Sequence, residues 1–180
     1  MLRFFLYLMV FALLSGCVAH RIEPIPPGVW RFSGKLSLQT SEESRILSID
    51  WYQAGEVSEI VLKGPLGVKV ATIRADQGEL IVDRGGQVVR YRDDDVLMQT
   101  GFEGLKLPWK SLSYWVRGHT EHGGQQLTSS EVKRGDWYFR ITETGIEGPL
   151  AMTLEHPRVK LRLRVRQWVI SAEETPLQKI

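Results

Sequence analysis

The hairpin sequence IVLKGPLGVKVATI, residues 60–73, decides the fold of this 180-residue chain. It consists of two β-rich arms joined by Gly64-Pro65-Leu66-Gly67. Pro65 presets φ to about −65° at the second turn position, and the glycines allow backbone angles that other residues resist, so we expect a tight, exposed loop. Leu66 is unusual because turn tips normally carry polar residues. Its side chain either caps its own hairpin or projects toward something apolar outside the protein.

Alternation of apolar and polar residues on both sides of this hairpin predicts strands with one wet face. Before the hairpin the pattern runs through Trp30–Leu38 and returns at Leu47, Ile49 and Trp51. With Glu79–Asp83 and Gln87–Arg92 it gives six strands joined by short turns, which is an antiparallel meander. Later strands are predicted at Leu127–Lys133, Trp137–Thr142, Ala151–Glu155 and Arg158–Trp168.

Two short helices are predicted between the two groups of strands. Asp93-Asp94-Asp95 offers capping side chains and favourable charge before a helix at Val96–Phe102. Pro108 opens a second helix, which Arg117-Gly118 ends. The residues that share one apolar face of this second helix, at helical spacing, are Trp109, Leu112, Trp115 and Val116.

About ten strands that are apolar on one side must cover that side, and two short helices cannot cover a flat sheet of this size. We therefore predict a mainly β fold, an unclosed antiparallel β-barrel with a small helical lid or plug around an apolar cavity. A fully packed interior is the alternative. The candidate lining residues are Trp30, Phe32, Leu36, Leu47, Ile49, Trp51, Trp109, Leu112 and Trp115.

The N-terminus has the pattern of a bacterial lipoprotein. Residues 1–16 combine Arg3, an apolar run and small residues before Cys17, as in a cleaved signal peptide. Leu14-Ser15-Gly16-Cys17 matches the lipoprotein box, in which the cysteine is lipidated. The alternative is a cysteine that happens to lie in an ordinary signal peptide. Cys17 is the only cysteine, so no internal disulfide can form.

The mature chain is predicted to have one domain. Residues 17–28, which include three prolines, form the lipidated N-terminus and an extended stalk. The domain covers residues 29–170, and residues 171–180 are a flexible tail. Val18 follows the cysteine. In enteric bacteria an aspartate at that position resembles a signal for retention in the inner membrane, so its absence favours the outer membrane.

Charge argues against nucleic acid as a partner, because cleavage removes only Arg3 and leaves 22 Lys+Arg against 21 Asp+Glu. The last strand nevertheless presents one basic face. Either this face contacts lipid phosphates or steers an acidic partner, or acidic neighbours on adjacent strands balance it in solvent. Its residues are Arg158, Lys160, Arg162, Arg164 and Arg166.

Sequence motifs for catalysis are absent, including a nucleophile elbow, a phosphate loop and a His-Glu-x-x-His zinc motif. His119 and His122 share a loop but lack further ligands nearby, so no metal site is expected. Helix capping explains the aspartate triplet, and Arg134-Gly135-Asp136 has turn composition. We expect a protein without enzymatic activity, metal or cofactor.

Several motifs together resemble the LolB family of outer-membrane lipoprotein receptors, from the signal peptide to about Trp168. The most specific are Gly64-Pro65-Leu66-Gly67 and the segment from Leu107-Pro108 through Leu112 to Tyr114-Trp115-Val116-Arg117-Gly118. The lipoprotein box, the Trp51 strand and the first-strand pattern agree with them. The first-strand pattern consists of Trp30, Gly34, Lys35 and Leu36.

The resemblance implies a receptor on the periplasmic face of the outer membrane, anchored through Cys17. Such a receptor accepts lipoproteins from the soluble carrier LolA and inserts them into the outer membrane. The lining residues would then contact acyl chains, and Leu66 matches an apolar loop-tip residue that promotes membrane insertion. The implied partners are a LolA-like carrier, acylated cargo and outer-membrane lipid, and we expect a monomer.

Two other functions are compatible with the residues. A lipocalin-like protein would store a small apolar molecule and need no carrier. An envelope hydrolase would need a nucleophile constellation that the sequence does not display.

Overall fold

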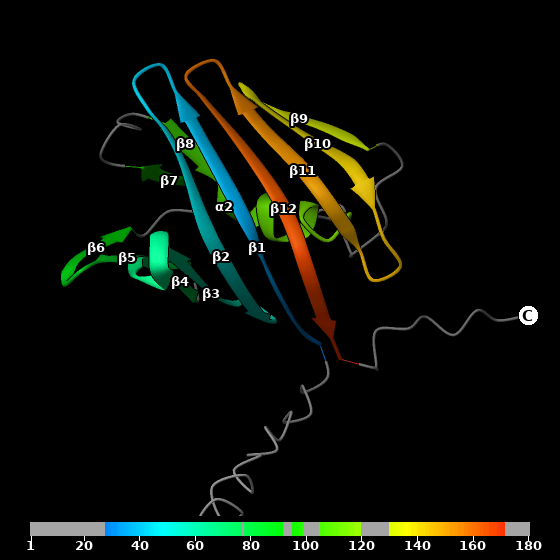
Figure 1. Cartoon of the computed structure of the whole chain (residues 1–180), viewed down its shortest axis with the longest axis horizontal. Coiled ribbons are helices and arrows are strands. Elements are labelled where there is room, and N and C mark those ends of the chain that lie inside the picture. The colour runs from blue at the N-terminus through cyan, green and yellow to red at the C-terminus, as the bar shows by residue number, and fades with distance from the viewer. Residues whose placement is uncertain (1–27, 77, 92–94, 99–104, 120–129, 172–180) are drawn as a thin grey trace, which may run out of the picture.

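A computed structural model describes residues 28–76, 78–91, 95–98, 105–119 and 130–171 of the chain. Ten strands of this part form one antiparallel sheet, in the order β6-β5-β4-β3-β2-β1-β12-β11-β10-β9 (Figure 1). They are β1 (Val29–Thr40), β2 (Ser44–Ala54), β3 (Val57–Lys63), β4 (Lys69–Asp76), β5 (Glu79–Arg84), β6 (Gln87–Tyr91), β9 (Glu131–Arg134), β10 (Trp137–Thr144), β11 (Pro149–His156) and β12 (Val159–Ile170).

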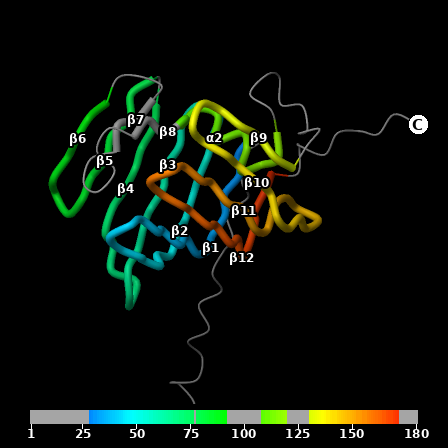
Figure 2. The backbone as a smooth tube through the Cα atoms, turned by 90° about the horizontal axis from the view of Figure 1, so that it is seen from above, coloured from blue at the N-terminus to red at the C-terminus, as the bar shows by residue number. Residues whose placement is uncertain are grey.

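The predicted six-stranded meander, β1 to β6, is confirmed by the pairing of each strand with its neighbour along the chain. The sheet curves strongly but does not close, because β6 and β9 remain its two edges. Figure 2 shows the strands curving around a concave side. The predicted class, a mainly β, unclosed antiparallel sheet with a small helix, is therefore confirmed.

The centre of the sheet is the long pairing of β1 with β12, which joins the two ends of the domain from Trp30↔Ile170 to Thr40↔Val159. A β-bulge interrupts the register at Ser33 and Gly34, where Arg166 is the extra residue. A Cβ on Gly34 would lie 2.3 Å from the carbonyl oxygen of Arg164, so the close approach of the two backbones requires glycine. The bulge also shifts the alternation, and Trp168 therefore faces inward opposite Phe32.

The helical prediction is correct for one segment and wrong for the other. The α-helix α2 (Trp109–Trp115) follows Pro108 as expected and lies on the concave side of the sheet (Figure 2). The helix predicted at Val96–Phe102 is instead β7 (Asp95–Met98) where the structure describes it, paired with β8 (Leu105–Pro108). A short apolar run fits a strand as well as a helix, and strand pairing decided between them.

The core joins the two halves of the sheet through α2. Buried side chains come from the meander, from the β9–β12 half and from the helix, including Ile60, Leu80, Trp115, Phe139 and Met152. Trp115 of α2 packs against Phe139 with ring centroids 5.6 Å apart. The helix thus fixes the curvature of the sheet, because both halves of the sheet pack against it.

Candidate acyl-chain face and protruding loop

The loop at Gly64–Gly67 forms a single 3-10 turn, η1 (Pro65–Gly67), between β3 and β4. The amide of Gly64 donates to the carbonyl of Val68 at 2.8 Å, and the amide of Gly67 donates to the carbonyl of Gly64 at 3.3 Å. Leu66 has φ 59° and ψ 15°, and among the described residues it is the sole non-glycine residue with positive φ. This left-handed conformation costs an L-residue about 1–2 kcal/mol.

The Leu66 side chain is fully exposed, at 101 % of its reference area. It therefore projects from the turn and does not cap its own hairpin. In Figure 2 the β3–β4 hairpin extends below the other coloured strands, on the side of the sheet opposite α2. Leu66 is therefore exposed apolar surface held in a strained conformation, and folding does not bury it.

A cluster of aromatic rings fills the part of the concave side near α2. Trp51 stacks on Trp109 of the helix at 5.4 Å between centroids, and Phe32 meets Trp168 edge-on at 4.8 Å. Trp30 bridges Trp51 and Trp168 at 5.6 and 5.8 Å. These rings are nearly fully buried, so this end of the interior is packed with aromatic side chains.

Polar groups inside this cluster are satisfied. The indole N–H of Trp51 donates to the Ser58 hydroxyl at 2.9 Å, and that of Trp168 donates to the carbonyl of Pro149 at 2.8 Å. The guanidinium of Arg117 lies 5.1 Å from the Trp168 ring centroid and donates to the carbonyl of Glu147. The cluster is thus a rigid floor for the concave side.

The rest of the concave side is a wall of half-buried aliphatic side chains, hereafter the aliphatic wall. Strand alternation directs these residues inward, and they pack on the core with part of their surface left accessible. The aliphatic wall comprises Leu36, Leu38, Leu62, Ile73, Val82, Leu161 and Leu163. It is apolar surface that the protein's own helix leaves partly uncovered.

The predicted lining residues divide between the floor and the wall. Trp30, Phe32, Ile49, Trp51, Trp109 and Trp115 are buried, so the four tryptophans face inward as predicted, but their surface is taken up by packing. Leu36, Leu47 and Leu112 are half-buried. Leu38, Leu62 and Leu161 were not among the predicted lining residues, although their alternation in the strands places them on the same face. Contact of any of these residues with acyl chains stays a prediction.

Two hollows among the described residues lie away from the aliphatic wall. One, of about 410 Å³, lies on the outer face of the sheet between β12, β1, β2 and β3 and is lined by residues such as Arg31, Tyr52 and Val169. The other, of about 850 Å³, lies where the β1–β2 and β11–β12 turns meet and is mostly polar.

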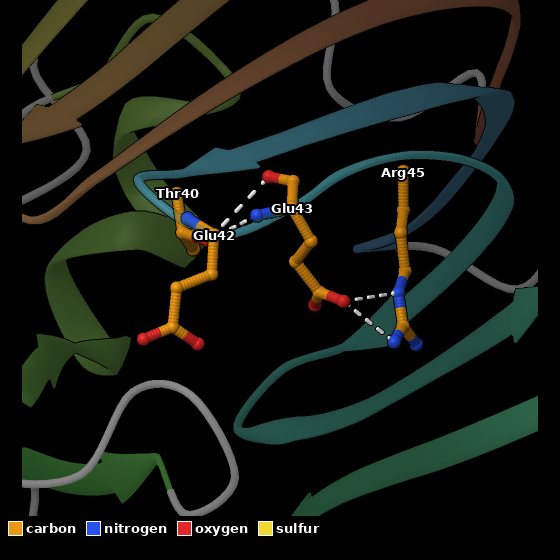
Figure 3. Close-up of polar contacts among 4 residues, drawn as sticks. All are labelled: Thr40, Glu42, Glu43 and Arg45. Carbon is orange, nitrogen blue, oxygen red and sulfur yellow. Dashed lines mark hydrogen bonds and ion pairs between the residues drawn. The ribbon is translucent and has the colours of Figure 1, made fainter.

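The turn between β1 and β2 forms a polar rim, in which Thr40, Glu43 and Arg45 interact (Figure 3). The Thr40 hydroxyl accepts from the amide of Glu43 at 3.1 Å, and the Glu43 carboxylate accepts from the Arg45 Nε at 2.9 Å. Arg45 lies in the inward register, opposite Leu38. The ion pair is exposed and adds about 0–1 kcal/mol to stability, so it shapes the rim more than it stabilises the fold.

The basic face of β12 is only partly balanced by acidic neighbours. Lys160 pairs with Glu155, and Arg164 pairs with Glu143 at 3.2 Å. Arg162 and Arg166 instead hydrogen-bond to neutral groups, the Gln39 amide oxygen and the Ser33 hydroxyl.

Some predictions concern residues outside the described ranges. They are Cys17 with the signal peptide and stalk, the first aspartates of the triplet, His122 and the residues after Ser171. Within the described ranges, histidine, cysteine and carboxylate side chains do not cluster in a way that could hold a metal ion. No helix in the same ranges has the length and hydropathy needed to span a membrane.

The chain is similar over most of its length to curated outer-membrane lipoproteins. It is 23 % identical to the outer-membrane lipoprotein LolB of Shewanella frigidimarina, covering 92 % of this chain and 93 % of that protein. The LolB of Cellvibrio japonicus is 27 % identical, covering 91 % of this chain and 94 % of that protein. Among solved structures, a LolA superfamily protein from Nitrosomonas europaea aligns with a TM-score of 0.42 at 9 % identity, covering 82 % of this chain and 88 % of that chain.

The family model described as outer membrane lipoprotein LolB matches residues 29–168, from the first residue of β1 to the inward-facing tryptophan of β12. This match covers the whole meander, α2, the protruding loop and the aliphatic wall on both halves of the sheet. The chain therefore belongs to the LolB family of outer-membrane lipoproteins.

Proposed function

We propose that the protein is a receptor, lipid-anchored through Cys17, that takes acylated lipoproteins from a LolA-like carrier and inserts them into the outer membrane. In this proposal the aliphatic wall holds the acyl chains. The Leu66 hairpin then engages the bilayer as the cargo leaves. The family is one of outer-membrane lipoproteins that act in lipoprotein localisation and are not enzymes.

The observation that carries the proposal is the fully exposed, strained Leu66 at the tip of the β3–β4 hairpin. Burial of a leucine side chain in an apolar medium is favourable by about 1.5–3 kcal/mol. Folding does not gain this free energy here, because the Leu66 side chain is not buried within the protein. A bilayer would supply the missing apolar surroundings.

The aliphatic wall supports the cargo-binding step. Each methylene that leaves water is worth about 0.8 kcal/mol, so an acyl chain of about sixteen carbons cannot cross an aqueous compartment unshielded at a useful rate. Leu38, Leu62 and Leu161 offer accessible apolar surface on the concave side. Transfer needs no nucleotide if affinity for the cargo rises from carrier to receptor to bilayer.

The test substitutes Leu66→Glu in the full lipoprotein and measures uptake of an acylated cargo from the carrier and its delivery into vesicles. We expect uptake and folding to be retained and delivery to be slowed, because a carboxylate opposes insertion into hydrocarbon. The matched control is Ile146→Glu. Ile146 is also fully exposed, at the tip of the β10–β11 hairpin, and its substitution should leave delivery unchanged. Normal delivery by Leu66→Glu would contradict the proposed role of the loop.

Capture of a LolA-like carrier separates this proposal from a lipocalin-like store, because a store has no reason to bind a carrier. Turnover of a lipid or glycan substrate by the purified protein would instead support the hydrolase alternative.

A further inference from the structure

The two central strands of the sheet are strongly basic. β1 and β12 together carry six lysine and arginine residues and no aspartate or glutamate. Their register sets Lys35 directly opposite Arg164, a like-charge pair that disfavours folding. The six cations are on the outer face or at its bulge, away from the aromatic cluster; they are Arg31, Lys35, Lys160, Arg162, Arg164 and Arg166.

Four of these cations, hereafter the basic stripe, have no carboxylate partner among the described residues: Arg31, Lys35, Arg162 and Arg166. Lys35 donates to the Ser48 hydroxyl at 2.9 Å, and Arg162 donates to the Gln39 amide oxygen at 3.4 Å. The acids on the neighbouring strands are already occupied. Asp50 pairs with Lys63 at 2.7 Å, and Glu59 pairs with Arg74 at 2.9 Å. The positive charge of the basic stripe is therefore not compensated within the described sheet.

Exposed apolar side chains lie beside the basic stripe on β2. Ile46 is 68 % exposed and is paired with Ser37 of β1, and Tyr52 is 41 % exposed and is paired with Arg31. The hollow of about 410 Å³ between Arg31, Tyr52 and Val169 lies on the same face. Cations interleaved with exposed apolar side chains are typical of surfaces that bind anionic bilayers.

The position of the basic stripe agrees with a bilayer as its partner. Arg31 lies two residues after Val29, where the domain begins, and the 11 residues from 18 to 28 can span at most about 40 Å from a lipidated Cys17. The β3–β4 hairpin with Leu66 extends to the same side of the sheet, opposite α2 (Figure 2). The headgroup phosphates of a membrane lie in a plane, so cations that are spread along one face of the sheet can each contact a phosphate.

We propose that the basic stripe binds the headgroups of anionic phospholipids in the membrane that carries the anchor and holds the outer face of the sheet against that membrane. The concave side with its aliphatic wall then faces away from the bilayer and stays open to the carrier. The inference rests on the proposed lipid anchor, but it does not depend on cargo transfer or on Leu66.

The experiment uses the full lipoprotein in vesicles of phosphatidylcholine with or without phosphatidylglycerol, without carrier or cargo. A fluorophore on Ser37→Cys reports the outer face of β1, and one on Gln87→Cys reports the far edge at β6. We expect headgroup-bound quenchers to reach the Ser37→Cys label only when phosphatidylglycerol is present, and less so as salt is raised. Each basic residue should raise the ratio of docked to undocked protein about fivefold, from about 1 kcal/mol per charge near an anionic surface.

The decisive variant combines Arg31→Gln, Lys35→Gln, Arg162→Gln and Arg166→Gln, and it should lose this quenching. The control combines Arg45→Gln, Arg90→Gln, Lys133→Gln and Arg140→Gln, which removes four exposed cations outside the basic stripe, three of them paired with glutamates that do not line the hollow at Arg31. The two variants lose the same net charge, so a difference between them reports the position of the charges, and the control should keep its quenching because its basic stripe is intact.

Equal quenching in both lipid mixtures, or equal loss in both variants, would overturn the proposal. A separate uptake assay with the carrier gives one more such outcome: unchanged quenching of the fourfold variant combined with slower uptake would also overturn the proposal, because the basic stripe would then bind an acidic protein. If the fourfold variant does not fold, as judged by its thermal unfolding, the single variants Arg31→Gln and Arg166→Gln are each expected to lower docking about fivefold. Delivery defects of Leu66→Glu are measured separately, so failure of that role leaves this test intact.

Discussion

Replacement of Leu66 by asparagine separates the stability of the protruding loop from its proposed function. Leu66 has φ 59° and is fully exposed, so its side chain contributes strain and almost no burial to the folded state. Asparagine tolerates the left-handed region better than leucine, and the side chain at this position is exposed to water in both the folded and the unfolded chain. We therefore expect the free energy of unfolding to rise by up to about 1 kcal/mol, which raises Tm by about 2–4 °C in a domain of this size.

Delivery should change in the opposite direction. Leu66→Asn removes an insertion energy of about 1.5–3 kcal/mol, which corresponds to a loss of about ten- to a hundredfold in bilayer engagement. Urea denaturation measures the first effect, and transfer of a labelled cargo from carrier to vesicles measures the second. Ile146→Asn is the control, because Ile146 is equally exposed but does not have positive φ, and it should change neither quantity.

Two results would refute this reasoning. A loss of stability of more than about 1 kcal/mol in Leu66→Asn would mean that the leucine packs against the protein. Unchanged delivery together with raised stability would mean that the loop is strained for a reason unrelated to insertion.

Two further predictions concern the sheet. Gly34→Ala should destabilise the domain by about 3 kcal/mol or more, because its Cβ would lie 2.3 Å from the Arg164 carbonyl oxygen in the β1–β12 bulge. Gly64→Ala is the control in the same urea titration, since its Cβ would lie no closer than 3.3 Å to a Val70 methyl and 3.9 Å to the Val68 carbonyl oxygen; equal costs would contradict the role of the bulge. Leu38→Asn in the aliphatic wall should weaken binding of acylated cargo about five- to thirtyfold, which corresponds to about 1–2 kcal/mol of lost apolar contact. Ile46→Asn on the outer face is the control and should leave cargo binding unchanged. Equal binding by both variants would exclude the aliphatic wall as the acyl site.

Much of the candidate site was predictable because its signals are local. The loop residues, the inward-facing tryptophans and the single helix after Pro108 all follow from turn chemistry and from periods of two or 3.6 residues. The division of the lining residues into a packed floor and a half-buried wall was not predictable. It depends on where α2 packs: Trp51 stacks on Trp109 of α2 and is buried, whereas Leu38 and Leu161 are half-buried.

The amino-acid sequence by itself determined the strands of the ten-stranded sheet, most of their inner and outer faces and the turn at Gly64–Gly67, since these depend on neighbours a few residues away. Tertiary structure alone decided that β1 pairs with β12, that Asp95–Met98 forms a strand and not a helix, and that the bulge at Gly34 turns Trp168 inward. It also decided that Leu66 projects into solvent. These outcomes depend on contacts between segments far apart in the chain, and a local pattern carries no information about which distant backbone will approach it.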